Sequence, residues 1–133
     1  MTLFRAFLIA GSLSVAFAVS ACGSDSPAAP SSIAVVTFAV HDETFRVSLT
    51  NADQLAAARA AQAGGPARIP IGRIASGAQV NVGWTWHLED LTFAEATIEL
   101  CDGRPSDVER EGNRFGGGAF CPWTATVIRI DEG

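Results

Sequence analysis

The residues best suited to chemistry in this 133-residue sequence lie between Thr85 and Cys121. His87 is one of only two histidines, and it directly follows the segment GWTW. A histidine beside a carboxylate can act as a general base, and Glu95 lies within reach if two strands pair here. A small envelope hydrolase that uses His87 as base, oriented by Glu95, is therefore one hypothesis.

A ligand-binding site is a second hypothesis for the same region. Six polar side chains are candidates for it: His87, Thr85, Glu95, Glu99, Arg104 and Arg114. A third hypothesis is purely structural, with His87 on the solvent-facing side of a strand that the tryptophans anchor. These patterns assign no catalytic residue, no cofactor and no metal site.

Spacing and composition argue against several reaction classes. Glu95 and Glu99 are about 13 Å apart along a strand, whereas a glycosidase pair needs about 5 to 9.5 Å. No GxSxG motif is present. The chain has no Tyr, and all nine basic residues are Arg, so tyrosine and lysine Schiff-base chemistry are excluded.

Cys101 and Cys121 are expected to form one disulfide, which in the chain-entropy model stabilises the fold by roughly 3 kcal/mol. The alternative is a metal site made by Cys101, Cys121, His87 and Asp102, but no CxxC or HxxxH spacing supports it. The 19-residue segment between the cysteines is too long for a mere connector. We expect it to be either functional or mobile, with a short helical turn after Pro105 and a glycine triplet that serves as a hinge or a close-packing segment.

The elements that must position these residues follow from the apolar pattern. Alternation predicts two strands at each of two places: over 36–40 and 45–49, and over 80–88 and 92–100. The predicted pairs in the first hairpin are Val40 with Phe45, Phe38 with Val47, and Val36 with Leu49. The second hairpin places Trp84 and Trp86 in the core over Ala96 and Ala94. His87 then faces solvent, opposite Phe93 and diagonal to Glu95.

Three further elements complete the predicted domain. A helix begins after Thr50 or Asn51 as N-cap and ends at Gly64–Gly65. The segment ARIPIGRIAS is expected to form an edge strand with a bulge, because Pro70 and Gly72 interrupt its isoleucines. The segment PWTATVIRI, which contains Trp123, is expected to form the final strand.

The first 21 residues have the features of a secretory signal: Arg5, then a short apolar stretch that ends in small residues. The end of this stretch, Val19-Ser20-Ala21-Cys22, resembles the lipobox of bacterial lipoproteins. The resemblance implies cleavage before Cys22 and lipidation of its thiol. Gly23, not aspartate, follows, which favours sorting to the outer membrane or cell surface.

Residues 22–32 are then the lipidated cysteine and a flexible tether rich in Ser, Pro and Ala. Residues 33–133 form one small globular domain. The formal net charge is −5, and loss of Arg5 with the signal makes the mature chain more acidic still. Nucleic acid is therefore not an expected partner. The expected partners are the membrane, through Cys22, and an unknown envelope protein or small ligand.

The blocks VNVGWTWHLED, FAEATIELCDGRPSDVE and FCPWTATVIRI resemble a small domain family found in secreted bacterial proteins. They are similar to the N-terminal domain of an amoebal calmodulin-binding protein. The resemblance covers nearly all of residues 36–130 and implies that these blocks belong to one domain. It implies no catalytic residues. Calmodulin binding is not carried over, because that mode uses a basic amphipathic helix and Arg59 is the only basic residue in the predicted helix.

The sequence therefore predicts an α+β fold, a small and mainly antiparallel β-sheet domain with one main helix and one disulfide. The expected function is that of a lipid-anchored extracytoplasmic binding or interaction module on a bacterial cell envelope. It is more consistent with a binding module than with an enzyme. The hydrolase with a His87–Glu95 pair is the alternative.

Overall fold

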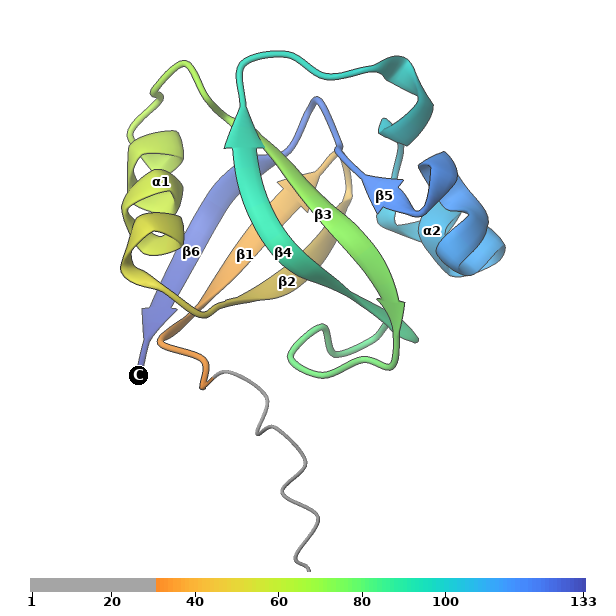
Figure 1. Cartoon of the computed structure of the whole chain (residues 1–133), viewed down its shortest axis with the longest axis horizontal. Helices are drawn as coiled ribbons and strands as arrows, with labels where there is room; N and C mark the ends of the chain where they lie inside the picture. Colours follow the sequence, from red (N-terminus) through yellow and green to blue (C-terminus); the bar gives the residue numbers. More distant parts are fainter. Residues whose placement is uncertain (1–30) are drawn as a thin grey trace, which may run out of the picture.

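Two three-stranded antiparallel sheets form the framework of the protein (Figure 1), as seen in a computed structural model that describes residues 31–133. The first sheet has the order β2-β1-β6 and the second β4-β3-β5. The strands are β1 Ala34–Val40, β2 Glu43–Leu49, β3 Ile69–Ser76, β4 Trp86–Ala94, β5 Ala119–Phe120 and β6 Thr126–Glu132. The helices are α1 Ala52–Gln62 and α2 Pro105–Glu111, with short 3-10 segments η1 Glu99–Cys101 and η2 Gly112–Gly117.

The two sheets share one core, in which aromatic rings from both pack together. Phe45 of β2 lies with its ring centroid 6.0 Å from that of Trp86 and 5.4 Å from that of Phe120. Helix α1 lies against β6 and β4 on one side of the sheets, and α2 lies on the other side (Figure 1). The predicted α+β class is confirmed. Among residues 31–133, no helix has the length and apolar character needed to cross a membrane. The predicted signal and lipobox lie outside the described residues.

The β1–β2 hairpin has the predicted face but not the predicted register. Its observed pairs are Phe38 with Phe45, Val36 with Val47, and Ala34 with Leu49. This is a shift of two residues, which keeps every apolar side chain on the core face because the side-chain period is two. A tight turn at His41 and Asp42, with φ of 55° at His41, replaces the wider predicted turn. Phe38 and Phe45 consequently stack, with centroids 4.9 Å apart.

The second predicted hairpin is wrong. Residues 80–85 are irregular, and β4 runs from Trp86 straight through the predicted turn to Ala94, paired with β3. The side chains assigned to the core are instead exposed, by 76% for Val82, 67% for Ile98 and 66% for Leu100. The physical reason is Asn81, which is fully buried. Its side chain accepts a hydrogen bond from Arg46 N and donates one to the Trp86 carbonyl, each 2.9 Å, so it replaces strand pairing for this segment.

Two local predictions hold, and a third is corrected. Asn51 caps α1 by accepting a hydrogen bond from Gln54 N, and Gly64 follows the helix with φ of 84°. The bulge in β3 is present, at Gly72, but β3 is a central strand and not an edge. Pro70 is tolerated there because β5 is only two residues long and pairs with Gly72 and Arg73 alone.

The segment between the cysteines is part of the domain and not a polar appendage. It contains α2, η2 and β5, and it contributes Val108, Phe115 and Phe120 to the core. Gly116 is required for close packing, because a Cβ there would lie 2.8 Å from Cys101 Cα. The close-packing interpretation of the glycine triplet therefore holds at this position.

Candidate functional site

His87 is buried, contrary to the prediction that it faces solvent. Only 5% of the residue is exposed, and it pairs with Ala75 of β3. Its Nδ1 lies 2.7 Å from the Gly77 carbonyl oxygen, and its Nε2 lies 3.2 Å from Glu89 Oε1. The predicted histidine–carboxylate contact therefore exists, but with Glu89 two residues along the same strand and not with Glu95.

The surroundings of His87 favour a structural role. A carbonyl and a carboxylate both accept hydrogen bonds, so an imidazole that donates from both nitrogens satisfies both. The hydrogen bond from His87 is the main cause that lowers the pKa of the Glu89 carboxyl, and the charge of Arg73 adds to it while partial burial opposes it. The contacts tie the 77–85 loop to β4, and they leave neither ring nitrogen free for a substrate.

Two other candidate residues are held by intramolecular contacts. Thr85 donates from its backbone N and its Oγ1 to the Glu109 carboxylate, at 2.9 and 3.0 Å. Arg104 Nη1 lies 2.9 Å from Asp42 Oδ1, in an ion pair between α2 and the first hairpin. These contacts fix α2 against the rest of the domain.

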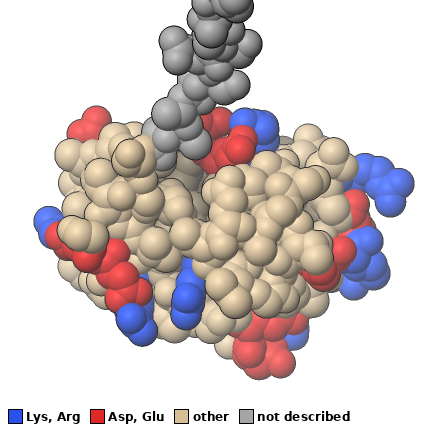
Figure 2. All heavy atoms as spheres, turned by 90° about the horizontal axis from the view of Figure 1, so that it is seen from below, with Lys and Arg blue, Asp and Glu red and all other residues tan. Residues whose placement is uncertain are grey.

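Glu99 and Arg114 are exposed, and neither has an ion-pair partner within 4 Å among residues 31–133. Figure 2 shows the face from which the N-terminal segment leaves the domain; acidic and basic side chains lie in small mixed groups around its edge. This face has no extended surface of positive charge of the kind that binds nucleic acid.

The predicted disulfide between Cys101 and Cys121 is present, with a Cα–Cα distance of 5.1 Å. It removes both thiols from the alternative metal site. Within residues 31–133, no group of three or more His, Cys, Asp and Glu side chains is arranged to hold a metal ion.

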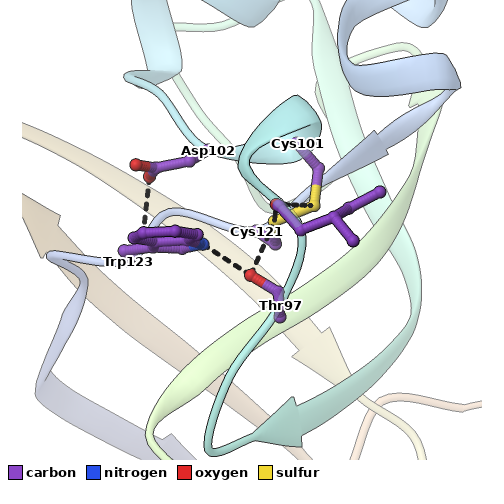
Figure 3. The surroundings of a disulfide bond; sticks show 6 residues. Thr97, Cys101, Asp102, Cys121 and Trp123 are labelled. Atoms are coloured by element: carbon purple, nitrogen blue, oxygen red, sulfur yellow. Dashed lines mark hydrogen bonds between the residues drawn. A yellow bond between two sulfur atoms is a disulfide. The ribbon is translucent and has the colours of Figure 1, made fainter.

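The disulfide lies next to a fixed tryptophan (Figure 3). Trp123 N donates to Asp102 Oδ1 at 2.8 Å, and the indole Nε1 donates to Thr97 Oγ1. Thr97 Oγ1 in turn lies 3.3 Å from the sulfur of Cys121. Although both of its N–H groups are bonded, Trp123 is 41% exposed. An indole held in one orientation with its surface open to solvent is a preorganised contact surface.

A pocket of about 400 Å³ lies beside this tryptophan. It is formed by the end of α1 and the 63–68 connection, by the residue after β4, and by the segment that leads into β6. We call it the Trp123 pocket. Its main polar and aromatic lining residues are Gln62, Arg68, Glu95, Trp123, Thr124 and Thr126. The volume is within the range typical of small-molecule sites.

Most polar groups of the Trp123 pocket are not used by the fold. Within residues 31–133, the side chains of Gln62, Arg68, Glu95 and Thr126 form no hydrogen bond or ion pair, and Thr124 Oγ1 has only a 3.3 Å contact with His41 Nε2. Arg68 and Glu95 supply one charge of each sign. The pocket can therefore offer several donors and acceptors to a ligand.

Two other hollows, of about 420 and 310 Å³, lie near the start of α1. Their polar groups are largely occupied. Gln54 lines both and bonds to Thr50 N and to the Leu91 carbonyl, while Asn51 caps the helix. In the smaller hollow, Glu89 is paired with His87 and Arg73. These hollows have less free hydrogen-bonding capacity than the Trp123 pocket.

Of the six candidate binding residues, only Glu95 lines the Trp123 pocket. Sequence reasoning missed Trp123, because it was assigned to the final strand, which in fact begins at Thr126. It also missed Arg68 and Gln62. The available signal was a tryptophan two residues after a disulfide cysteine, which is a position where the backbone is held.

Fold and site together define a small disulfide-bonded α+β domain with a mixed polar and aromatic pocket at one end. The family model for the N-terminal domain of the calmodulin-binding protein mentioned above matches residues 32–132, and the chain belongs to this N-terminal domain family. The resemblance expected from the sequence is thus confirmed for the domain. No curated protein and no solved structure matches the chain.

Proposed function

We propose that the protein is a lipid-anchored, extracytoplasmic binding module of a bacterial cell envelope, and that it captures a small ligand in the Trp123 pocket. The observation that carries the proposal is the exposed indole of Trp123, fixed by Asp102 and Thr97 beside polar side chains that the fold leaves free. Residues of this kind gather where a ligand supplies the missing partners.

The position of the pocket supports the membrane-anchored part of the proposal. Ala34 pairs with Glu132 at one end of the first sheet, and the described chain starts at this end. The Trp123 pocket is at the opposite end, where Thr126 pairs with Ala39 (Figure 1). A seven-residue strand separates the two ends by roughly 20 Å. An anchor at Cys22 would therefore leave the pocket facing away from the bilayer.

The hydrolase alternative has lost its geometric basis. His87 is buried against Gly77 and Glu89, while Glu95 lines the Trp123 pocket. His87 is not among the pocket residues, so the proposed base and its orienting carboxylate do not share a site.

The anchor is tested by labelling cells with a palmitate analogue. The wild-type chain should take up the label and fractionate with membranes, because acyl chains bury enough CH₂ groups to hold a protein on a bilayer. Cys22→Ser should lose both properties, and Ser24→Ala is the matched control that should keep both. A Cys22→Ser chain that remains labelled would show that the anchor is elsewhere.

The pocket is tested by NMR on the full lipidated chain in a detergent without a sugar headgroup. The Trp123 indole N–H resonance is followed during titration with glycine, inorganic phosphate, and trisaccharides of glucose and N-acetylglucosamine. At least one probe should shift this resonance in wild type and fail to bind to Trp123→Ala. If none of the probes moves it, the proposed binding function is overturned.

A further inference from the structure

We infer that the Trp123 pocket takes an uncharged saccharide, with one face of a pyranose ring stacked on the indole of Trp123. This inference rests on the proposed binding function, because it names the ligand class of the same pocket. It is carried by the orientation of the indole and by the charge balance of the lining residues.

The first step concerns which part of Trp123 a ligand can reach. Its Nε1–H is already bonded to Thr97, so the ring offers its apolar surface and not its donor. The other two tryptophans are built into the fold: Trp86 is 2% exposed, and Trp84 donates to the Thr44 carbonyl and packs against the core. Trp123 alone among the three is an exposed platform. A pyranose has a flat face of C–H groups that matches such a platform.

The second step concerns the polar groups around the platform. The Gln62 amide and the Thr124 and Thr126 hydroxyls can each donate and accept hydrogen bonds, as sugar hydroxyls do. Arg68 adds donors and Glu95 adds acceptors. Mixed donors and acceptors around one aromatic ring fit a ligand whose edge carries several hydroxyl groups.

The third step excludes other ligand classes. The lining charges of Arg68 and Glu95 cancel, so a strongly anionic or cationic ligand finds no net attraction. A quaternary ammonium ligand is held by a cage of several aromatic rings, and Trp123 is the one aromatic residue of this lining. A zwitterionic amino acid would depend on ion pairs with Arg68 and Glu95. Both are exposed, and exposed pairs contribute only about 0 to 1 kcal/mol each.

The fourth step concerns rigidity. Trp123 is two residues from the disulfide-bonded Cys121, and its backbone N–H is bonded to Asp102. Binding therefore freezes little of the protein at this point, which lowers the entropic cost of association. A platform fixed before the ligand arrives suits a weak ligand that must be held mainly by stacking and neutral hydrogen bonds.

The test is calorimetric titration of the full lipidated chain, in a detergent without a sugar headgroup, with the trisaccharides of glucose and of N-acetylglucosamine. We expect wild type to bind at least one of them. Trp123→Ala should lose at least tenfold in affinity, and Trp123→Phe should retain part of it because a smaller apolar face remains. Glu95→Gln and Arg68→Gln should each weaken binding severalfold. Glu99→Gln, an exposed carboxylate outside the pocket, is the matched control and should bind as wild type.

The outcomes separate this inference from the proposed function. If neither sugar binds but phosphate or glycine shifts the Trp123 resonance, the saccharide assignment is overturned and the pocket remains a binding site. If no probe binds, both fall. If a sugar binds and Trp123→Ala, with an unchanged thermal melt, binds it equally well, the placement of the ligand is wrong.

Discussion

The indole N–H of Trp123 is bonded to the hydroxyl of Thr97, a residue 26 positions earlier in the chain. The same hydroxyl contacts the sulfur of Cys121 at 3.3 Å, so one threonine links the exposed tryptophan to the disulfide. The bond decides how the ring is presented. It uses the only polar atom of the indole and leaves an apolar surface of fixed orientation at the pocket.

Thr97→Val is expected to release this ring at little cost in volume. A single intramolecular hydrogen bond contributes about 1 kcal/mol net, so the free energy of unfolding should fall by about that amount. Affinity for the trisaccharide that wild type binds should fall severalfold, because the indole is no longer preorganised. Thr92→Val, at an exposed threonine of β4 outside the Trp123 pocket, is the control. Equal affinity of Thr97→Val and wild type would show that the bond has no part in binding.

The core tryptophan and the pocket tryptophan should differ sharply in stability effects. Trp86→Ala is expected to cost about 3 to 5 kcal/mol, because the ring is buried against Phe45 and Phe120. Trp123→Ala should cost much less. Within residues 31–133 the Trp86 Nε1 is buried without a hydrogen-bond partner, so Trp86→Phe should be tolerated far better than Trp86→Ala. Denaturant melts measure all three, and a Trp123→Ala chain as unstable as Trp86→Ala would place Trp123 in the core.

Stability should decline in acid partly through Glu89. Its pKa is lowered from 4.5 in the folded protein, chiefly by the hydrogen bond from His87. A carboxyl with a lowered folded pKa stabilises the fold above its unfolded pKa, and that contribution is lost as the pH falls through the folded value. The side chain is 39% exposed, so the effect should be no more than about 1 kcal/mol.

Melts of Glu89→Gln between pH 6 and pH 3 should therefore show a shallower loss than wild type. Some slope will remain, because the pKa of Asp107 is also lowered, chiefly by the hydrogen bond from Arg104 N. Glu99→Gln is the matched control. An unchanged slope in Glu89→Gln would contradict the assigned His87–Glu89 contact.

Reduction of the disulfide should affect both stability and binding. The bond closes a segment with a sequence separation of 20, and the chain-entropy model gives roughly 3 kcal/mol for such a loop. Binding should weaken as well, because Trp123 follows Cys121 by two residues. Melts and titrations of the Cys101→Ser/Cys121→Ser double variant measure both. A variant that keeps wild-type affinity would show that the disulfide does not hold the platform.

Much of the fold could be predicted because it follows from local patterns. The hairpin faces follow from alternation, the start of α1 from Asn51, and the disulfide from two cysteines left over after Cys22. The register of the first hairpin was less accessible, since a shift of two residues preserves the same face. Only the stacking of Phe38 on Phe45 and the tight turn at His41 distinguish the two registers.

The tryptophan segment shows why the remainder could not be predicted. Its strict alternation is also compatible with an irregular loop, provided that a buried group satisfies the backbone. Asn81 is that group, and its partner Arg46 lies 35 residues away, where no local pattern reveals it. With the hairpin misplaced, His87 was assigned to solvent and Glu95 to its side. Glu95 does line the pocket, but beside Trp123, which reaches it from the other end of the domain sequence.

The most direct test of the central claim is a set of intermolecular NOEs between Trp123 and a bound trisaccharide of glucose or N-acetylglucosamine. The account predicts NOEs from the C–H protons on one face of a pyranose ring to the Trp123 indole protons, and none to the buried indole of Trp86. A trisaccharide that gives its NOEs to another part of the surface, or that gives none at concentrations up to tens of millimolar, would contradict it.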